Sequence, residues 1–239
     1  MRYQKQFTVI MILMTFSMLL LTGCADGPIQ TRSEDVSDFE RIRIETFGEF
    51  LIEQGEEESL TIEAPRDYLR YITTEVDDKT LVINTRRGFI GGPVRRVIFT
   101  ITVKDLDAIT LSGAGAVKII NLKSEELAVT LTGAGSIEID DLQARELDVN
   151  LTSAGAIIIA GKVDKQDIDL SGVGSYEAGD LQSEEANISL SGAGSAVVWV
   201  KDLLDVDVSG LGSVSYYGKN PVVRQNVSGL GSVNSRGER

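Results

Sequence analysis

The sequence predicts an all-β protein whose second half is a parallel β-helix, a solenoid of about seven coils with 18–20 residues each. Three observations predict this fold. A short motif of small residues occurs seven times, and its successive second glycines are 20, 20, 19, 20, 18 and 19 residues apart. Apolar residues alternate on both sides of each copy, and no helical periodicity competes with them. A fixed period of this length indicates stacked coils that bury their apolar side chains against one another.

Two strands flank each copy of the motif. Four and six residues before the second glycine stand apolar pairs such as Leu131 with Val129, and two and four residues after it stand pairs such as Ile137 with Ile139. Alternation with a period of two is the pattern of a strand that buries one face. We therefore expect each strand to pair with its counterpart in the next coil.

Glycine makes the corner between these strands. In Ser-Gly-x-Gly-Ser it tolerates positive φ and has no Cβ to collide with the neighbouring coil. The opposite corner is predicted near Asn121-Leu122 and Asp141-Leu142, where an Asx residue turns the chain and the leucine points inward. Dinucleotide-binding glycines would need a helix after the turn, and calcium β-rolls have a nine-residue period, so neither motif fits.

The front of the chain is less periodic. Residues 36–105 predict short strands, either as a small β domain or as irregular first coils that cap the solenoid, because the open end of a β-helix is an unpaired edge. Residues 106–239 form the predicted repeat β-helix. Residues 24–35 are polar and contain Pro28, and we expect them to be a flexible tether.

The first residues predict export and lipid attachment. Arg2 and Lys5 precede an uncharged, mostly apolar run over 7–21, so residues 1–23 have the layout of a signal peptide. The sequence Leu-Thr-Gly-Cys at 21–24 resembles the lipobox of bacterial lipoproteins, which implies cleavage before Cys24 and its acylation. The membrane is thus a predicted partner through a lipid anchor. Ala25 favours the outer membrane or cell surface over the inner membrane.

The composition argues against several functions. Asp and Glu outnumber Lys and Arg by 36 to 23, and a net charge of −13 disfavours binding to nucleic acid and to anionic lipid headgroups. The chain has no histidine, the commonest general base and zinc ligand, and its one cysteine cannot form an internal disulfide. We therefore predict that the protein is not an enzyme and has no catalytic residues, cofactor or metal site.

The sequence resembles the putative auto-transporter adhesin, head GIN domain family of exported bacterial proteins. The residues that carry the resemblance are Phe39-Glu-Arg-Ile-Arg-Ile44, Phe50-Leu-Ile-Glu-Gln-Gly55, Thr80-Leu-Val-Ile83 and the Leu-Ser-Gly-Ala-Gly-Ser coils, within 36–234. No Gly-Ile-Asn tripeptide occurs, so no motif residue is carried over. The resemblance implies a right-handed β-helix with an adhesive or envelope role, and it supplies no ligand.

The alternation places a strip of short acids and amides on the outside of the first strand. Its members are Asp148, Asn150, Asp167, Asp169, Asn187, Ser189, Asp205 and Asp207. One interpretation is a binding face for a cation or a glycan, because closely spaced carboxylates repel one another unless something neutralises them. The other, which we favour, is a solvated face that keeps a long sheet soluble.

Two further features of the sequence suggest binding surfaces. Val197, Trp199 and Tyr217 are predicted to point outward on adjacent coils, either as a site for sugar stacking or a protein interface, or beneath a loop or tail that folds over them. Four arginines flank an apolar, glycine-rich loop over 86–96. We interpret it as a solvated loop, or alternatively as a contact for lipid headgroups or an acidic partner.

The predicted function is a non-enzymatic, lipid-anchored protein of the cell envelope that presents its solenoid for adhesion or envelope assembly. The leading alternative is a glycan-binding module of a polysaccharide-handling system. A carbohydrate-active enzyme on a β-helix is a more distant alternative. The expected partners are a glycan or another envelope protein, and oligomer formation stays open.

Overall fold

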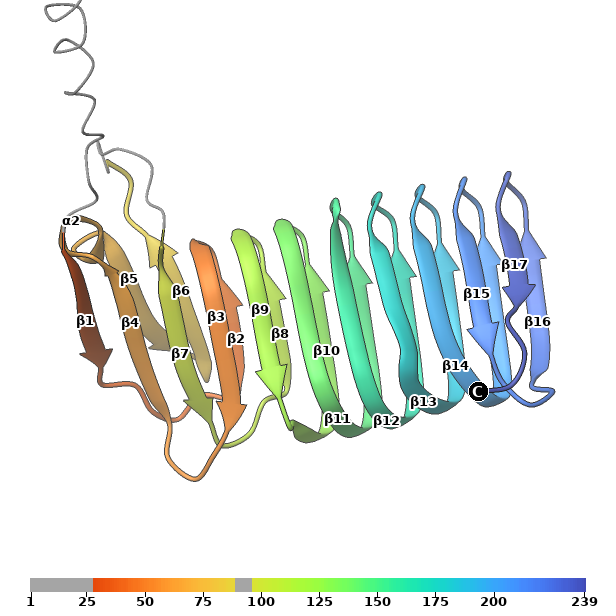
Figure 1. Ribbon diagram of the computed structural model, residues 1–239, viewed down its shortest axis with the longest axis horizontal. Helices are drawn as coiled ribbons and strands as arrows, with labels where there is room; N and C mark the ends of the chain where they lie inside the picture. The colour runs from red at the N-terminus through yellow and green to blue at the C-terminus, as the bar shows by residue number, and fades with distance from the viewer. Residues whose placement is uncertain (1–27, 89–95) are drawn as a thin grey trace, which may run out of the picture.

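The computed structural model describes residues 28–88 and 96–239, which form one continuous β-solenoid (Figure 1). The strands are β1 (Ile29–Glu34), β2 (Arg41–Ile44), β3 (Phe47–Gln54), β4 (Ser59–Pro65), β5 (Ile72–Asp77), β6 (Thr80–Thr85), β7 (Ile98–Val103), β8 (Ala108–Leu111), β9 (Ala114–Ile120), β10 (Lys123–Leu131), β11 (Ala134–Leu151), β12 (Gly155–Leu170), β13 (Ser175–Leu190), β14 (Ser195–Val208), β15 (Ser213–Tyr217), β16 (Val222–Val227) and β17 (Ser232–Ser235). One short helix, α2 (Arg66–Leu69), is too short to cross a membrane, and the described residues contain no helix that could span one.

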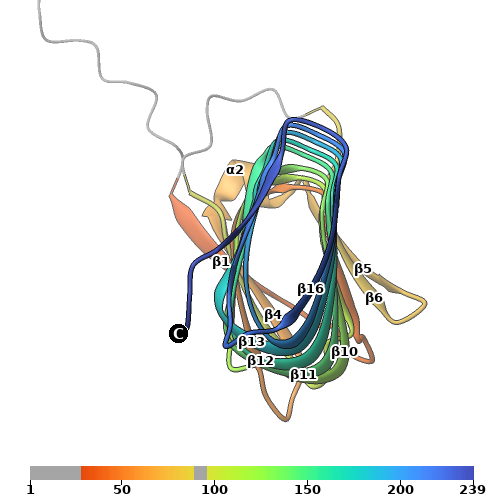
Figure 2. The ribbon, with the colours of Figure 1, turned by 90° about the vertical axis from the view of Figure 1, so that its right-hand side faces the viewer.

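The seven glycine-bearing segments stack in parallel, as predicted. Before the corner, Ile109 of β8 pairs with Val129 of β10, which pairs with Val149 of β11. After the corner, the ladder continues from β9 through β11, β12, β13 and β14 to β15 and β17. Viewed along the axis, the coils superimpose on a single flattened outline (Figure 2). Long strands such as β11 bend around the second corner and belong to both faces.

The apolar alternation fills the interior. The inward side chains on both faces of the coils are buried, among them Ile109, Leu131, Ile137 and Val206. They belong to one core that runs without interruption from the front of the chain through the repeats. The drift in repeat length is absorbed at the second corner, where the register shifts between Ile139 and Leu142 of β11. The other shifts lie at the same corner of later coils, so the buried columns stay aligned.

The two predicted kinds of corner are both present. At the second corner, Asn121 and Asp141 adopt positive φ of 53° and 56°, which Asx residues tolerate better than most others do. At the first corner, a Cβ on Gly133 would lie 1.9 Å from the carbonyl oxygen of Gly113 in the preceding coil. The coils therefore stack so closely that this position excludes any side chain.

Within 36–105, the described residues 36–88 and 96–105 form the first coil and a cap that share one core with the repeats. Strands β2 and β3 form a coil that pairs in parallel with β8 and β9. On its far side, β6 and β7 add to the two faces, and the antiparallel partners β5 and β4 follow them. The stacked rings of Phe50 and Phe99, with centroids 4.5 Å apart, join the first coil to the cap.

The predicted tether is wrong for part of its length. Ile29–Glu34 is strand β1, which pairs antiparallel with the outer edge of β4. The Arg32 guanidinium donates hydrogen bonds to the carbonyl oxygens of Leu69 and Ile72, at 2.7 and 3.1 Å. Because β1 is held by backbone pairing and buries little apolar surface, its sequence lacks the alternation that would have revealed a strand.

A polar network interrupts the apolar interior. The Tyr176 hydroxyl donates to Gln166 Oε1 at 2.9 Å, Gln166 Nε2 donates to Ser183 Oγ at 2.8 Å, and Ser183 Oγ donates to the Trp199 carbonyl oxygen at 3.1 Å. All three side chains are fully buried, and burial raises the pKa of the Tyr176 hydroxyl. Buried polar groups are tolerated where each finds a partner, as these do.

Candidate binding surface

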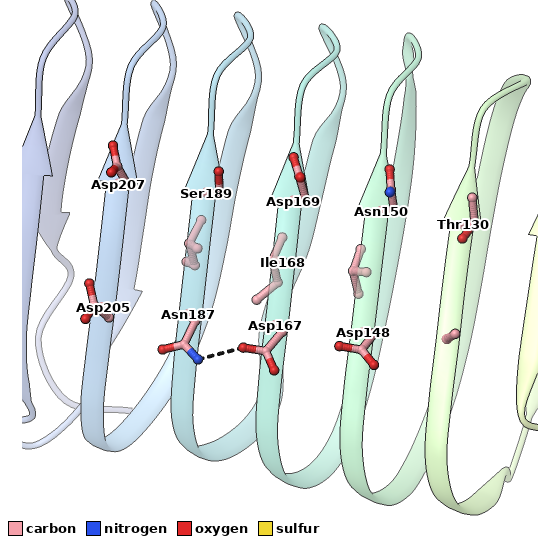
Figure 3. Close-up of a pocket in the computed structure, with 13 residues that line it drawn as sticks. Thr130, Asp148, Asn150, Asp167, Ile168, Asp169, Asn187, Ser189, Asp205 and Asp207 are labelled. Carbon is pink, nitrogen blue, oxygen red and sulfur yellow. Dashed lines mark hydrogen bonds between the residues drawn. The ribbon is translucent and has the colours of Figure 1, made fainter.

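The predicted strip of acids and amides lines a groove on the face formed by β10 to β14 (Figure 3). The groove has a volume of about 550 Å³. The parallel register places equivalent residues directly above one another, one strand spacing or about 4.8 Å apart. Side chains of two outward positions form its polar columns, and the strand residues between them, including Ile168, form its floor.

The first column consists of Asp148, Asp167, Asn187 and Asp205 on successive coils. Asp167 is fixed from two sides, because Asn187 Nδ2 donates to Asp167 Oδ1 at 2.6 Å and Lys165 Nζ donates to Asp167 Oδ2 at 2.6 Å. The amide thus separates two carboxylates that would otherwise be neighbours.

Asp148 lies at the end of this column, beside Asp167, and its side chain is exposed. Partial burial raises the pKa of the Asp148 carboxyl above its ordinary value, and the negative charge of Asp167 raises it further. The hydrogen bond to Asp167 also raises the pKa of the Lys165 ammonium group, and for a lysine this shift favours the charged form. The column therefore holds negative charge beside the counter-charge of Lys165, and the register places Arg224 next to Asp205 at its other end.

The second column runs parallel to the first. Its members are Thr130, Asn150, Asp169, Ser189 and Asp207. Figure 3 shows both columns pointing out of the sheet on the same side. Asn226 extends the second column by one coil and donates from Nδ2 to Asp207 Oδ2 at 3.3 Å. Together the columns offer carboxylate acceptors beside amide and hydroxyl groups that both donate and accept.

The geometry gives no support to the cation interpretation. Within residues 28–88 and 96–239, no three or more Asp, Glu, Cys or His side chains converge closely enough to hold a metal ion. The stacked carboxylates instead form an extended row, since each coil contributes its acid at the height of its own strand. A row of this kind suits a long ligand with many hydroxyl groups better than a single ion.

The aromatic patch lies on the other face and is covered. Trp199 of β14 pairs with Tyr217 of β15, and both side chains are half-buried. The Arg239 guanidinium lies 6.0 Å from the Trp199 ring centroid and 5.2 Å from that of Tyr217. Arg239 also bonds to the Gly179 carbonyl oxygen and the Asp180 carboxylate. The structure thus has the arrangement in which the tail folds over these aromatics; Figure 1 shows the C-terminus near β14.

The predicted exposure of Val197 is wrong. Val197 is 7% exposed, because its side chain packs near Gly179 together with Tyr217 and Arg239. The strand alternation does direct Val197 outward, but the tail then covers the position. The aromatic patch and the polar groove stand on opposite faces, so the structure does not join them into one site.

Two other predicted features lie partly or wholly outside the described residues. Cys24 falls in 1–27, and the centre of the arginine loop falls in 89–95, including Arg95. At the described ends of that loop, Arg86, Arg87 and Arg96 are exposed.

Lys165, which contacts the groove residue Asp167, was not predicted from the sequence. It precedes Asp167 by two positions, so the same alternation that placed the acids outward also places the lysine there. Only acids and amides were considered at this position, although the Lys165 ammonium group contacts the Asp167 carboxylate.

The chain is similar to a known protein family and to several solved structures. The family model described as putative auto-transporter adhesin, head GIN domain, matches residues 38–220. A solved putative adhesin from Bacteroides fragilis NCTC 9343 shares 26% identity at a TM-score of 0.84, over 87% of this chain and 97% of that chain.

Two further solved structures, both from Parabacteroides distasonis ATCC 8503, share the fold. A putative adhesin has 22% identity and a TM-score of 0.69, over 88% of this chain and 98% of that chain. A putative lipid binding protein has 24% identity and a TM-score of 0.66, over 88% and 97%. No curated protein matches the chain.

Proposed function

Because this chain belongs to the putative auto-transporter adhesin, head GIN domain family, we propose that it is a non-enzymatic adhesion protein of the cell envelope. In this proposal a lipid on Cys24 anchors the chain, and the solenoid presents the polar groove of Figure 3 as its contact surface. The rigid stacking of the coils suits this role, since it holds a long array of side chains in fixed positions without a ligand present.

One observation carries the proposal. The groove places polar side chains at the same two outward positions of successive coils, and Asp167 in its first column is held by Asn187 and Lys165. Side chains that are already oriented lose little conformational entropy on binding, so even a row of modest contacts can contribute affinity. Repetition along the axis also provides several equivalent contacts for one extended partner.

A glycan is the second, more specific candidate for that partner, which would make the chain a glycan-binding module. Carboxylates accept hydrogen bonds, and the amides of Asn150 and Asn187 both donate and accept. Sugar hydroxyls also do both, so they can pair with either kind of group in the groove. Assembly with another envelope protein is the competing use of the same surface.

Binding of the full chain to a glycan array, together with adherence of cells that display it, tests the groove. The variant Asp148→Asn/Asp167→Asn/Asp205→Asn keeps the shape of the first column and removes its charge. A hydrogen bond to a charged group contributes roughly 1.5–3 kcal/mol, so binding to a glycan array should fall about tenfold or more. Glu138→Gln, on the opposite face, is the matched control and should bind normally.

Unchanged glycan binding by the triple variant would remove the groove from the proposal. Loss of crosslinks to envelope proteins, with no glycan bound by either protein, would favour envelope assembly. Anchoring is tested separately: Cys24→Ser should release the protein from the membrane fraction, and retention there would contradict the lipid anchor.

A further inference from the structure

A row of exposed apolar side chains follows the glycine corners along one edge of the solenoid. We call this row the corner ridge; its members are Phe47, Ala114, Ala134, Ala154, Val173, Ala193, Leu211 and Leu230. The four larger side chains are 37%, 68%, 66% and 86% exposed in that order along the chain. Figure 1 shows the corners aligned along the upper edge of the solenoid.

Hydrogen bonds make the ridge continuous from coil to coil. Phe47 pairs with Ala114, and Ala114 with Ala134. Farther along, the Leu211 amide donates to the carbonyl oxygen of Gly192 at 3.0 Å, and the Leu230 amide donates to that of Gly210 at 3.1 Å. The ridge residues therefore project from one rigid edge, at a spacing set by the stacked coils.

Stacking does not explain why these positions are apolar. The flanking glycines are fixed by the neighbouring backbone, since a Cβ on Gly210 would lie 1.9 Å from the Gly192 carbonyl oxygen. The residue between the glycines points into open solvent, where a charged side chain would fit equally well. A leucine at this position exposes apolar surface to water with no compensating contact in the described structure.

Charge is absent from the seven glycine corners of the ridge, although exposed Glu45 and Glu49 flank Phe47 at its first corner. The seven glycine corners span 112–116, 132–136, 152–156, 171–175, 191–195, 209–213 and 228–232, which is seven times five or 35 residues. None is Asp, Glu, Lys or Arg, although 25% of the chain is charged, which would place about nine charges in 35 residues. This edge therefore differs from both acidic faces.

Pro28, the first described residue, lies at this same edge. The Arg66 amide of α2 donates to the Pro28 carbonyl oxygen at 3.1 Å. Tyr68 of α2 contacts Phe47, with ring centroids 5.1 Å apart, so α2 lies beside the first residue of the ridge. Cys24 precedes Pro28 by four residues, a reach of at most about 14 Å.

Arginines lie near this end of the ridge. Arg66 belongs to α2, Arg70 follows it and forms an ion pair with Asp67, and the Arg86 amide donates a hydrogen bond to the Tyr71 carbonyl oxygen. Arg66, Arg86 and Arg87 are exposed. Positive side chains beside an apolar edge complement the anionic headgroups of a bilayer.

We propose that the corner ridge rests on the lipid bilayer, so that the solenoid lies with its axis along the membrane and its groove face to one side. This inference rests on the proposed lipid anchor, which would hold the ridge at the membrane surface. Phe47 at one end and Leu211 and Leu230 at the other would enter the interfacial region, with the alanines between them at headgroup level.

A second copy of the chain is the less suitable occupant. The ridge is one residue wide at each coil, whereas a stable protein interface buries about 800 Å² on each partner. A bilayer makes no such demand, because it surrounds a narrow ridge and because the anchor removes most of the entropic cost of association.

Fluorescence of a labelled, acylated chain in vesicles tests the orientation. The full chain carries Leu211→Cys with an NBD label; wild type, whose Cys24 is acylated, controls for labelling. The vesicles contain phosphatidylcholine and phosphatidylglycerol, with and without bromine on the acyl chains. NBD at position 211 should shift to shorter wavelength and be quenched several-fold by the brominated lipid. The same label at Lys162→Cys, at the opposite corner, should remain aqueous and unquenched.

Each outcome is decisive. Equal, water-like emission from both labels on an acylated chain would overturn the orientation and leave the anchor intact. A blue shift at position 211 without bromolipid quenching would overturn it in favour of ridge-to-ridge association. A chain that carries no lipid on Cys24 would overturn the anchor and the orientation together.

Discussion

The glycine corner and the outward strand face belong to the same coil, yet they tolerate different degrees of change. At the corner, a Cβ on Gly133 would lie 1.9 Å from the Gly113 carbonyl oxygen, so no side chain fits there. On the outward face, one stacked position changes from coil to coil; its occupants are Thr130, Asn150, Asp169, Ser189 and Asp207. Repetition in this sequence therefore marks the stacking contacts, and variation marks the surface where chemistry can differ.

The strongest test of this contrast replaces a corner glycine. Gly133→Val places side-chain atoms against the backbone of the preceding coil, and the two coils must move apart, so we expect a loss of roughly 3 kcal/mol in the free energy of unfolding. Urea unfolding followed by circular dichroism measures the change. Ala134→Asp, one residue away but exposed, should remain within about 0.5 kcal/mol of wild type. Similar midpoints for the two variants would contradict the steric account.

An intermediate effect is expected inside the coil, where polarity is tolerated only as a complete network. Gln166→Leu removes the partner of the buried Tyr176 hydroxyl, which should cost roughly 1–3 kcal/mol. Adding Tyr176→Phe to this variant removes the unpaired hydroxyl and should recover part of the loss. Thermal unfolding of both variants distinguishes the cases, and a further loss in the double variant would refute the network interpretation.

The smallest effect should come from the outward face. Asp148 has a raised pKa in the folded state, so the folded protein holds this proton more tightly than the unfolded chain does. Its contribution to stability consequently falls as pH rises from the unfolded pKa through the folded pKa, and returns on acidification. Asp148→Asn should increase the free energy of unfolding at pH 7 by less than about 0.5 kcal/mol after solvent screening, which thermal unfolding would show as a slightly higher melting temperature. This difference should vanish at acid pH, where Asp148 is protonated; an advantage that persists there would contradict the electrostatic explanation.

Much of the groove was predictable because it depends on local periodicity. Alternation along β12 put Asp167 and Asp169 outward, and the repeat length put them beside Asp148 and Asn187. The ion pair of Lys165 was available from the same rule and was overlooked. Val197 could not be placed correctly by any local rule, since its burial depends on a tail residue more than 40 positions later.

The sequence by itself determined the stacked coils, the two corners and the inward and outward columns, because each repeat encodes the same local alternation and the same steric demand for glycine. Only the tertiary structure decided three matters: the pairing of β1 with β4, the closure of the tail over Trp199, and the shared edge of α2 and the corner ridge. These features depend on contacts between segments that share no repeat. Such contacts form only after folding has brought the segments together, so no local pattern in the sequence reveals them.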